Sequence, residues 1–178
     1  MTEQEIITGC RHRDRRTQHL TYKKYGAKVL GICKRYMKDR ERAEEMTMNT
    51  FLLVFQKIDL YKDEGSFEGW ILRIAVNCCL MELRKKTNFI NEVDPYEIQL
   101  PTIPPDYLLK DDIEKMLNTL PEGARIVFNL YAIEGYRHAE IAERLGISEG
   151  TSKSQLNYAK EKLKKIFFNT SDLKNRKL

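Results

Sequence analysis

The chain has 178 residues, of which 42% are hydrophobic and 32% charged, and its formal net charge is +5. This length suits one ordinary domain or two small ones. No apolar run approaches the roughly 20 residues that a membrane-spanning helix needs, and the amino terminus lacks the apolar core of a secretory signal peptide. We therefore expect a soluble cytoplasmic protein rather than a membrane protein.

The charges fall into three blocks along the chain. Residues 1–88 hold 18 Lys and Arg against 12 Asp and Glu, and residues 110–178 hold 13 against 10. Between them, residues 89–109 hold four acidic residues, no Lys or Arg, and four of the five prolines. Prolines oppose a continuous helix, and two basic blocks around an acidic one are typical of a nucleic-acid-binding protein with a linker. We predict an all-α protein with two small helical domains, 1–88 and 110–178, joined by the linker 89–109.

Two helices are predicted near the start of the first domain. Apolar residues at steps of three and four indicate one helix from about residue 17 to 38 and another from 39 to 58. Asp39 suits the N-cap of the second helix.

A third helix is predicted after a break at residues 61–66, which contain Gly65 and a cluster of charges. Ser66 can cap the helix, which runs from residue 67 to about residue 86. Its apolar stripe includes Trp70, which we interpret as a core residue from its helical spacing. The other face of this helix carries Arg73, Asn77, Arg84 and Lys85.

The second domain is predicted to hold several shorter helices and one long one. Pro121 fits the first position of a helix, and Gly135 can end that helix. A further helix spans about residues 138–145, and Gly146 permits a tight turn into a last helix after Ser148.

The stretch HAEIAERLGISEGTSKSQL fits a helix-turn-helix, since small Ala142 permits close crossing and Ile141, Leu145, Ile147 and Leu156 supply a shared core. In such a unit the first residues of the second helix meet base edges in the DNA major groove. The candidate contacts are Thr151, Lys153, Ser154, Gln155, Asn157 and Tyr158. A solvent-facing helix would carry the same polar face, so this stretch alone leaves both interpretations open.

Nothing in the sequence indicates catalysis or metal binding. The three histidines stand apart from one another, and the four cysteines show no Cys-x-x-Cys or Cys/His spacing. No glycine-rich phosphate loop occurs. We interpret Cys33 and Cys78, which fall on apolar stripes, as buried residues, and we expect no enzymatic activity, no cofactor, no metal and no small-molecule substrate.

Two stretches of the chain resemble a known family. DRERAEEMTMNTFLLVFQKIDLYKDEGSFEGWILRIAVNCCLMELRKK is similar to region 2, and LPEGARIVFNLYAIEGYRHAEIAERLGISEGTSKSQLNYAKEKLKK to region 4, of the extracytoplasmic-function (ECF) sigma factors. These belong to the sigma-70 family of bacterial transcription initiation subunits. The resemblance covers about residues 17–168 in the family's order. It implies a subunit that binds core RNA polymerase and directs promoter recognition.

The resemblance also implies roles for residues of the first domain. Its acidic helix would bind the β′ clamp helices of polymerase through Glu44, Glu45, Met48 and Asn49, although family members usually carry Asp, Gln and an acid at the last three positions. A solvated helix face is the alternative reading of the two glutamates. The loop at 61–66 and the helix after it would recognise the −10 promoter element through Tyr61, Lys62, Arg73, Asn77, Arg84 and Lys85. We expect Asn77 to contact a base and the basic residues to hold phosphates, while a core role for Tyr61 stays open.

For the second domain, the resemblance implies that the last helix reads the −35 promoter element and that the domain meets the polymerase β flap. Family members commonly carry Val at position 152 and Arg at 155 and 158. Ser152 weakens the apolar stripe, and the missing arginines reduce attraction for phosphate, so the promoter preference should differ. The acidic linker would thread through basic channels of the polymerase, and a membrane-linked anti-sigma protein would restrain the chain.

Two other functions fit parts of the sequence. A conventional helix-turn-helix regulator would bind duplex DNA as a dimer without polymerase, but it would leave the first domain without a role. A decoy that sequesters an anti-sigma protein without binding DNA would not need the lysines that follow Ser148.

Overall fold

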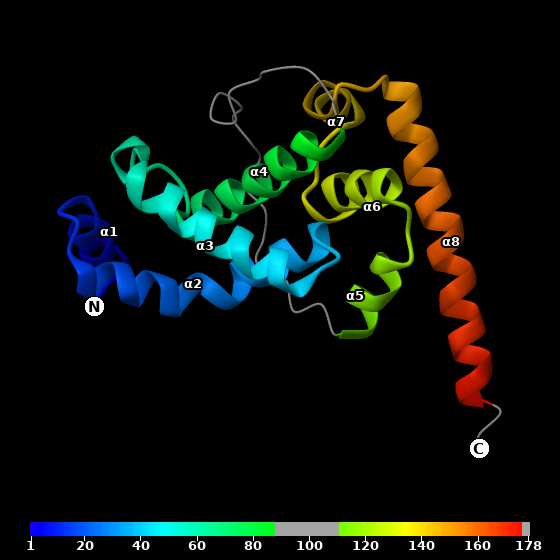
Figure 1. Cartoon of the computed structure of the whole chain (residues 1–178), viewed down its shortest axis with the longest axis horizontal. Coiled ribbons are helices and arrows are strands. Elements are labelled where there is room, and N and C mark those ends of the chain that lie inside the picture. Colours follow the sequence, from blue (N-terminus) through cyan, green and yellow to red (C-terminus); the bar gives the residue numbers. More distant parts are fainter. Residues whose placement is uncertain (88–110, 176–178) are drawn as a thin grey trace. The chain divides into compact units, whose positions relative to one another are not determined.

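The computed structural model describes residues 1–87 and 111–175, and within these ranges the chain forms helices and turns without a strand (Figure 1). The described residues separate into two compact units, residues 1–87 (unit 1) and 111–175 (unit 2), which we describe one at a time. The predicted all-α, two-domain fold is confirmed. The predicted linker at 89–109 lies outside the described residues.

Unit 1 contains four α-helices and a short 3₁₀ turn. They are α1 (Glu3–Arg11), α2 (Arg15–Tyr36), α3 (Arg40–Gln56), the turn η1 (Ile58–Leu60) and α4 (Phe67–Thr87). Asp39 caps α3 as predicted, because its side chain accepts a hydrogen bond from the amide of Glu41. Asp14 caps α2 in the same way through the amide of Thr17.

Helix α1 forms at a site where the sequence analysis identified no separate helix. Thr2 and Glu5 make a capping box at its start, in which each side chain accepts a hydrogen bond from the other residue's amide, at 3.2 and 2.8 Å. The helix buries Ile6, Ile7 and Cys10 against the rest of unit 1. The Thr-x-x-Glu spacing is the sequence signal that could have predicted it.

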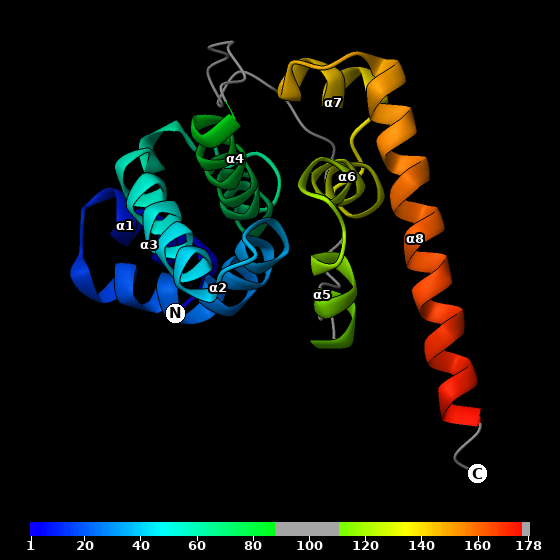
Figure 2. The same ribbon diagram turned by 45° about the vertical axis from the view of Figure 1, so that its right-hand side comes forward.

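Helices α2, α3 and α4 pack against one another and enclose the core of unit 1 (Figures 1 and 2). The core side chains are mostly aliphatic and aromatic and come from all three helices: Tyr25, Val29, Ile32, Tyr36, Ala43, Phe51, Val54, Phe67, Ile71 and Ala75. Cys33 and Cys78 are buried as predicted. Trp70, which was predicted as a core residue, is half-buried. It lies at the edge of the core, where it stacks on Phe67 with ring centroids 5.9 Å apart.

Unit 2 consists of three short helices and one long one. They are α5 (Asp111–Asn118), α6 (Glu122–Phe128), a π-helical turn η2 (Asn129–Ile133), α7 (His138–Leu145) and α8 (Glu149–Asn175). In both views α8 is a single long rod with α7 beside its amino-terminal end (Figure 2). Pro121 is the N-cap of α6 rather than its first helical residue, because its ψ of 149° is extended.

The core of unit 2 lies where α5, α6 and α8 meet. Its fully buried members are Leu117, Leu120, Ala124 and Ala159, and Phe128, Ile133 and Leu163 pack around them. Among the described helices, none is long and apolar enough to cross a membrane. Up to residue 166, the contacts with this core anchor α8 along one stripe, and its opposite side is exposed.

Candidate nucleic-acid interfaces

The turn between α7 and α8 joins two helices that pack closely. Gly146 ends α7 with a φ of +65°, a left-handed conformation that glycine adopts without steric penalty. The amide of Ile147 then donates to the carbonyl of Ala142 over 3.0 Å. Ile141 and Leu156 are buried where the two helices meet. The predicted helix-turn-helix is formed, and it is built from the residues that the sequence pattern indicated.

The first turn of α8 is held by hydroxyl groups. Ser148 accepts a hydrogen bond from the amide of Thr151 at 3.0 Å, and the two hydroxyl oxygens lie 2.9 Å apart. Ser154 donates to the carbonyl of Thr151 at 3.0 Å. Both Thr151 and Ser154 are exposed, as expected of DNA-contacting residues. Their hydroxyl groups already have partners within the helix, so DNA would have to share or replace these hydrogen bonds.

Exposed polar residues continue along the same side of α8. Lys153, Asn157 and Tyr158 are exposed, and Lys153 lies 3.6 Å from the carboxylate of Glu149. Gln155 differs from them, because it is half-buried and its amide group packs beside Gly123 of α6. We call Lys153, Ser154, Asn157 and Tyr158 the recognition face of α8.

A part-buried hydrogen bond that the sequence did not predict fixes α8 against α7. Ser152 is fully buried on the apolar side of α8, and its hydroxyl oxygen lies 2.9 Å from Nδ1 of His138. The imidazole in turn stacks on Tyr131, with ring centroids 4.6 Å apart. A polar residue on an apolar stripe was the available signal, but the sequence does not show which residue it meets.

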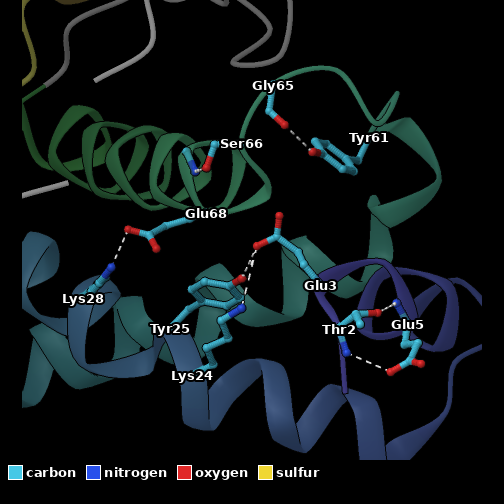
Figure 3. Close-up of polar contacts among 11 residues, drawn as sticks. Thr2, Glu3, Glu5, Lys24, Tyr25, Lys28, Tyr61, Gly65, Ser66 and Glu68 are labelled. Carbon is cyan, nitrogen blue, oxygen red and sulfur yellow. Dashed lines mark hydrogen bonds and ion pairs between the residues drawn. The ribbon is translucent and has the colours of Figure 1, made fainter. Parts of the chain in front are cut away.

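The 61–66 loop of unit 1 is organised around Tyr61. This residue is only 5% exposed, and its hydroxyl donates to the carbonyl of Gly65 at 2.9 Å (Figure 3). Its ring packs on Phe67 and Trp70. Burial, with the charges of Glu3 and Asp63, raises the pKa of Tyr61, so the phenol stays a donor. Of the two readings of Tyr61 that the sequence left open, this conformation favours the core role, in which the side chain supports the loop from within.

The remaining candidates for the −10 element lie on or beside this loop. Lys62 is exposed in the loop itself. Arg73, Asn77 and Arg84 are half-buried on α4, and their spacing of four and seven residues places them on one side of the helix. Lys85 is exposed, with its ammonium group 3.4 Å from Glu82. The structure thus gathers five candidates on α4 and the loop that precedes it.

The candidate polymerase-binding residues lie on α3. Glu44, Glu45 and Met48 are exposed, and Asn49 is half-buried. Leu52, one turn beyond Met48, is 56% exposed, and Met48 is 57% exposed. Two large apolar side chains exposed at a spacing of four residues form a small apolar patch, a feature of protein-binding surfaces. The sequence analysis missed Leu52, because its position in the helical period was not considered.

Acidic, histidine and cysteine side chains do not gather into a metal-binding group in the described residues. Within the described parts of the chain, no group of three or more His, Cys, Asp or Glu side chains is arranged to hold a metal ion. Burial raises the pKa of the Cys78 thiol to about 11, so this cysteine is neutral at pH 7 and is a poor ligand and nucleophile.

Comparisons with known protein families give two matches that follow one another along the chain. Residues 21–89 match the family described as Sigma-70 region 2, and residues 110–163 match Sigma-70, region 4. The first match covers α3, the 61–66 loop and α4, and the second covers the helix-turn-helix with the recognition face of α8. Both sets of candidate residues therefore fall inside matched segments.

Several curated proteins are similar over most of the chain. The ECF RNA polymerase sigma factor SigE of Mycolicibacterium smegmatis is 29% identical over 150 residues, 80% of this chain but 58% of that protein. The ECF RNA polymerase sigma-E factor of Haemophilus influenzae is 24% identical over 90% of this chain and 93% of its own length. The RNA polymerase sigma-H factor of Pseudomonas aeruginosa is 24% identical over 92% of each.

Two solved structures have a similar fold. One is CnrH in complex with the cytosolic domain of CnrY, with a TM-score of 0.50, 16% identity, and coverage of 92% of this chain and 96% of that one. The other is the sigma factor RpoE in complex with the anti-sigma factor NepR from Bartonella quintana, with a TM-score of 0.51 and 20% identity over 84% of this chain and 95% of that one.

Proposed function

The chain belongs to the ECF group of the sigma-70 family, and from this premise we propose how its units divide promoter recognition between them. Its function is that of a sigma factor, which binds core RNA polymerase and directs it to promoters for transcription initiation. We assign residues 1–88 to polymerase binding and the −10 element and residues 110–178 to the −35 element, with residues 89–109 as the connecting linker.

The −35 element is assigned to the recognition face of α8. The observation that carries this assignment is that Lys153, Asn157 and Tyr158 are exposed on a helix whose opposite stripe is anchored in the core of unit 2. The amide of Asn157 can pair with adenine through two hydrogen bonds, and Lys153 can meet phosphate or guanine. Gln155 packs against α6, so it contributes less to DNA contact than its neighbours.

The −10 element is assigned to the 61–66 loop and the adjoining face of α4. Promoter opening requires that unstacked bases be captured, for which amide groups and stacking surfaces serve better than charge alone. Asn77 offers the amide, while Lys62, Arg73, Arg84 and Lys85 offer positive charge for phosphates.

Core polymerase is assigned to the exposed face of α3. Glu44 and Glu45 supply charge, although Glu44 already accepts a hydrogen bond from Arg40 at 2.8 Å. Met48 and Leu52 supply an apolar patch in the next two turns of α3. A surface of this kind suits the β′ clamp helices of polymerase, and unit 2 would meet the β flap.

The remaining partners follow from the same assignment. Both solved structures of similar fold are complexes, with the cytosolic domain of CnrY in one and the anti-sigma factor NepR in the other. We infer that an anti-sigma protein also restrains this chain. Catalysis would belong to the polymerase, so we assign the chain no enzymatic activity, cofactor or small-molecule substrate, and we place it in the cytoplasm with the polymerase and the chromosome.

Run-off transcription tests the proposal. The purified chain would be added to core polymerase from the same bacterium, with fragmented genomic DNA as template. We expect new, discrete start sites that share two short upstream elements. A chain variant with Glu44 and Glu45 replaced by Lys should lose these transcripts while keeping its helical content, and an Arg42→Glu variant serves as a control at another position on α3. Protection of duplex sites by the chain alone, without transcripts, would favour the conventional regulator.

A further inference from the structure

Helix α1 lies outside the segment that matches region 2, which begins at residue 21. Its contacts nevertheless reach the loop assigned to the −10 element. A guanidinium nitrogen of Arg11, in the last turn of α1, donates to the carbonyl of Tyr61 at 2.6 Å and to the carboxylate of Asp63 at 2.8 Å. These contacts join parts of the chain 50 and 52 residues apart.

The 61–66 loop has little support of its own. Its residues form no helix or strand, so the backbone lacks a regular hydrogen-bond ladder there. Two of its residues, Asp63 and Gly65, have positive φ angles of 57° and 76°. Glycine adopts such an angle without steric penalty, and Asp tolerates it better than most residues. It is the missing hydrogen-bond ladder, more than these angles, that makes the loop depend on contacts from outside.

The contacts that hold the loop come from two sides. From within, the hydroxyl of Tyr61 donates to the carbonyl of Gly65. From α1, Arg11 binds both the backbone at Tyr61 and the side chain of Asp63. The guanidinium group suits this position, because its donors are held in a rigid plane and its charge strengthens both hydrogen bonds. Arg11 thus fixes the loop at two points.

Helix α1 is itself firmly attached to α2. Tyr25 donates to the carboxylate of Glu3 at 2.8 Å, and the ammonium group of Lys24 lies 3.7 Å from the same carboxylate (Figure 3). A β-carbon on Gly9 would lie only 2.4 Å from the side chain of Thr17, so the Thr17 side chain of α2 lies directly against the backbone of α1 there. The position of Arg11 is consequently set by the core of unit 1.

We propose that α1 positions the −10 loop, with Arg11 as the positioning residue that holds residues 61–66 in the shape that captures promoter bases. This inference rests on the proposed role of the loop in −10 recognition. Arg11 acts through the loop and not on the DNA, because its guanidinium group is occupied by the loop carbonyl and carboxylate and its side chain is only 29% exposed. Lys62, Glu64 and Ser66 remain exposed around the held backbone and form its outer surface.

The test measures base discrimination by the complete holoenzyme. The probes are single-stranded non-template oligonucleotides that carry the −10 element of a promoter found by run-off transcription, and the same oligonucleotides with one base replaced at a time. Wild type, Arg11→Ala, Arg11→Lys and Asp63→Asn would be compared. Arg15→Ala, an exposed arginine at the start of α2, removes the same charge from a nearby position.

We expect Arg11→Ala to reduce discrimination between the native and altered −10 bases at least fivefold and to slow promoter opening, with core binding and helical content unchanged. The discrimination by Arg11→Lys should lie between that of wild type and that of Arg11→Ala. A lysine ammonium group does not reproduce the two hydrogen bonds that the planar guanidinium group makes. Asp63→Asn keeps an acceptor and tolerates the backbone angle but loses the ion pair with Arg11, so it should also give a partial loss, whereas Arg15→Ala should stay within twofold of wild type.

Three results would overturn the inference. One is wild-type discrimination by Arg11→Ala. Another is a uniform loss of affinity for all oligonucleotides that Arg11→Lys restores, which would make Arg11 a phosphate contact. The third is a loss of base discrimination in Arg11→Ala that is accompanied by weaker binding to core polymerase or by unfolding of the chain. If the wild-type holoenzyme itself failed to discriminate −10 bases, the proposed function of the loop would fail together with the inference.

Discussion

The two surfaces assigned to DNA are supported in different ways. In unit 2 the recognition face belongs to a continuous helix, and its residues are set by the pitch of α8 and by the buried seam of Leu156 and Ala159. In unit 1 the 61–66 loop has no regular structure and is held by side chains, including one from a helix 50 residues earlier. A regular helix suits the reading of duplex DNA, whose groove geometry is constant.

The loop suits a different task. A captured base has left the helical stack, so its partner needs a shaped surface rather than a regular one. Such a surface is built by tertiary contacts, and it is lost when one of them is removed. The comparison therefore predicts that substitutions on α8 act locally on DNA contact, whereas substitutions behind the loop act at a distance.

The largest effect is expected on the recognition face. Combined Lys153→Glu and Asn157→Ala should reduce promoter output on the order of 100-fold, since each groove contact contributes about 1–3 kcal/mol. Lys164→Glu makes the same charge change about 16 Å further along α8 and should leave output within about twofold. Run-off transcription from one promoter measures both, and equal losses for the two variants would mean that only net charge matters.

A smaller effect on promoter opening is expected from a substitution that weakens the support of the 61–66 loop. Tyr61→Phe removes the hydroxyl that donates to Gly65 and keeps the ring, so the loop should lose about 1 kcal/mol of support, equivalent to about fivefold in promoter opening. Tyr22→Phe, at an exposed tyrosine of α2, is the matched control. Permanganate reactivity of the −10 thymines measures opening. Unchanged opening in Tyr61→Phe would show that the ring alone supports the loop.

The hydrogen bond between His138 of α7 and Ser152 of α8 gives a prediction about the stability of unit 2. Ser152→Ala removes the partner of His138 and should lower the free energy of unfolding of unit 2 by about 1 kcal/mol. Ser154→Ala, an exposed serine on the same helix, should change it by less than about 0.5 kcal/mol. Far-UV circular dichroism follows both units, while the fluorescence of the single tryptophan, Trp70, reports on unit 1 alone. A change in the Trp70 transition alone would place the loss of stability in unit 1 and contradict the prediction.

A further effect is expected from alkaline pH in unit 1. Burial raises the pKa of Cys78 from 9.0 to about 11, and it also raises the pKa of Tyr25 and Tyr61. A group whose pKa is higher in the folded than in the unfolded state stabilises the fold, and this stabilisation is complete below the unfolded-state pKa. It is lost as the pH rises through the folded-state pKa. The melting temperature of unit 1, followed by the fluorescence of Trp70, should thus fall between pH 9 and 11. The substitution Cys78→Ala should make this fall smaller. A melting temperature that rises over this range would contradict the assignment.

The sequence predicted the parts of the fold that depend on local pattern. Helical periodicity located α2, α3, α4 and α8, and a glycine at the right spacing located the turn of the helix-turn-helix. These signals lie within a few residues of the structure that they specify. The exposed recognition residues followed directly, because a buried stripe determines the opposite face of a helix.

Contacts between distant residues could not be read in this way. In the sequence, Arg11 is one of several arginines near the amino terminus. The residues around it do not indicate that it binds Tyr61 and Asp63, which lie 50 and 52 residues away. The sequence is compatible with either an exposed or a buried Tyr61. Only its packing on Phe67 and Trp70 in the folded protein shows that it is buried. Ser152 was recognised as unusual for its stripe, but its partner His138 lies on another helix.

One measurement tests the central claim, that unit 1 and unit 2 of a single polymerase-bound chain read two different promoter elements. Iron chelates would be tethered to Glu64→Cys in the loop and to Glu161→Cys, one turn beyond Asn157 on α8; both native residues are exposed and the four native cysteines are buried. With core polymerase and a promoter found by run-off transcription, we predict DNA cleavage near the −10 element from position 64 and near the −35 element from position 161. Cleavage by the chain alone, at two symmetric half-sites from both positions, would contradict the account.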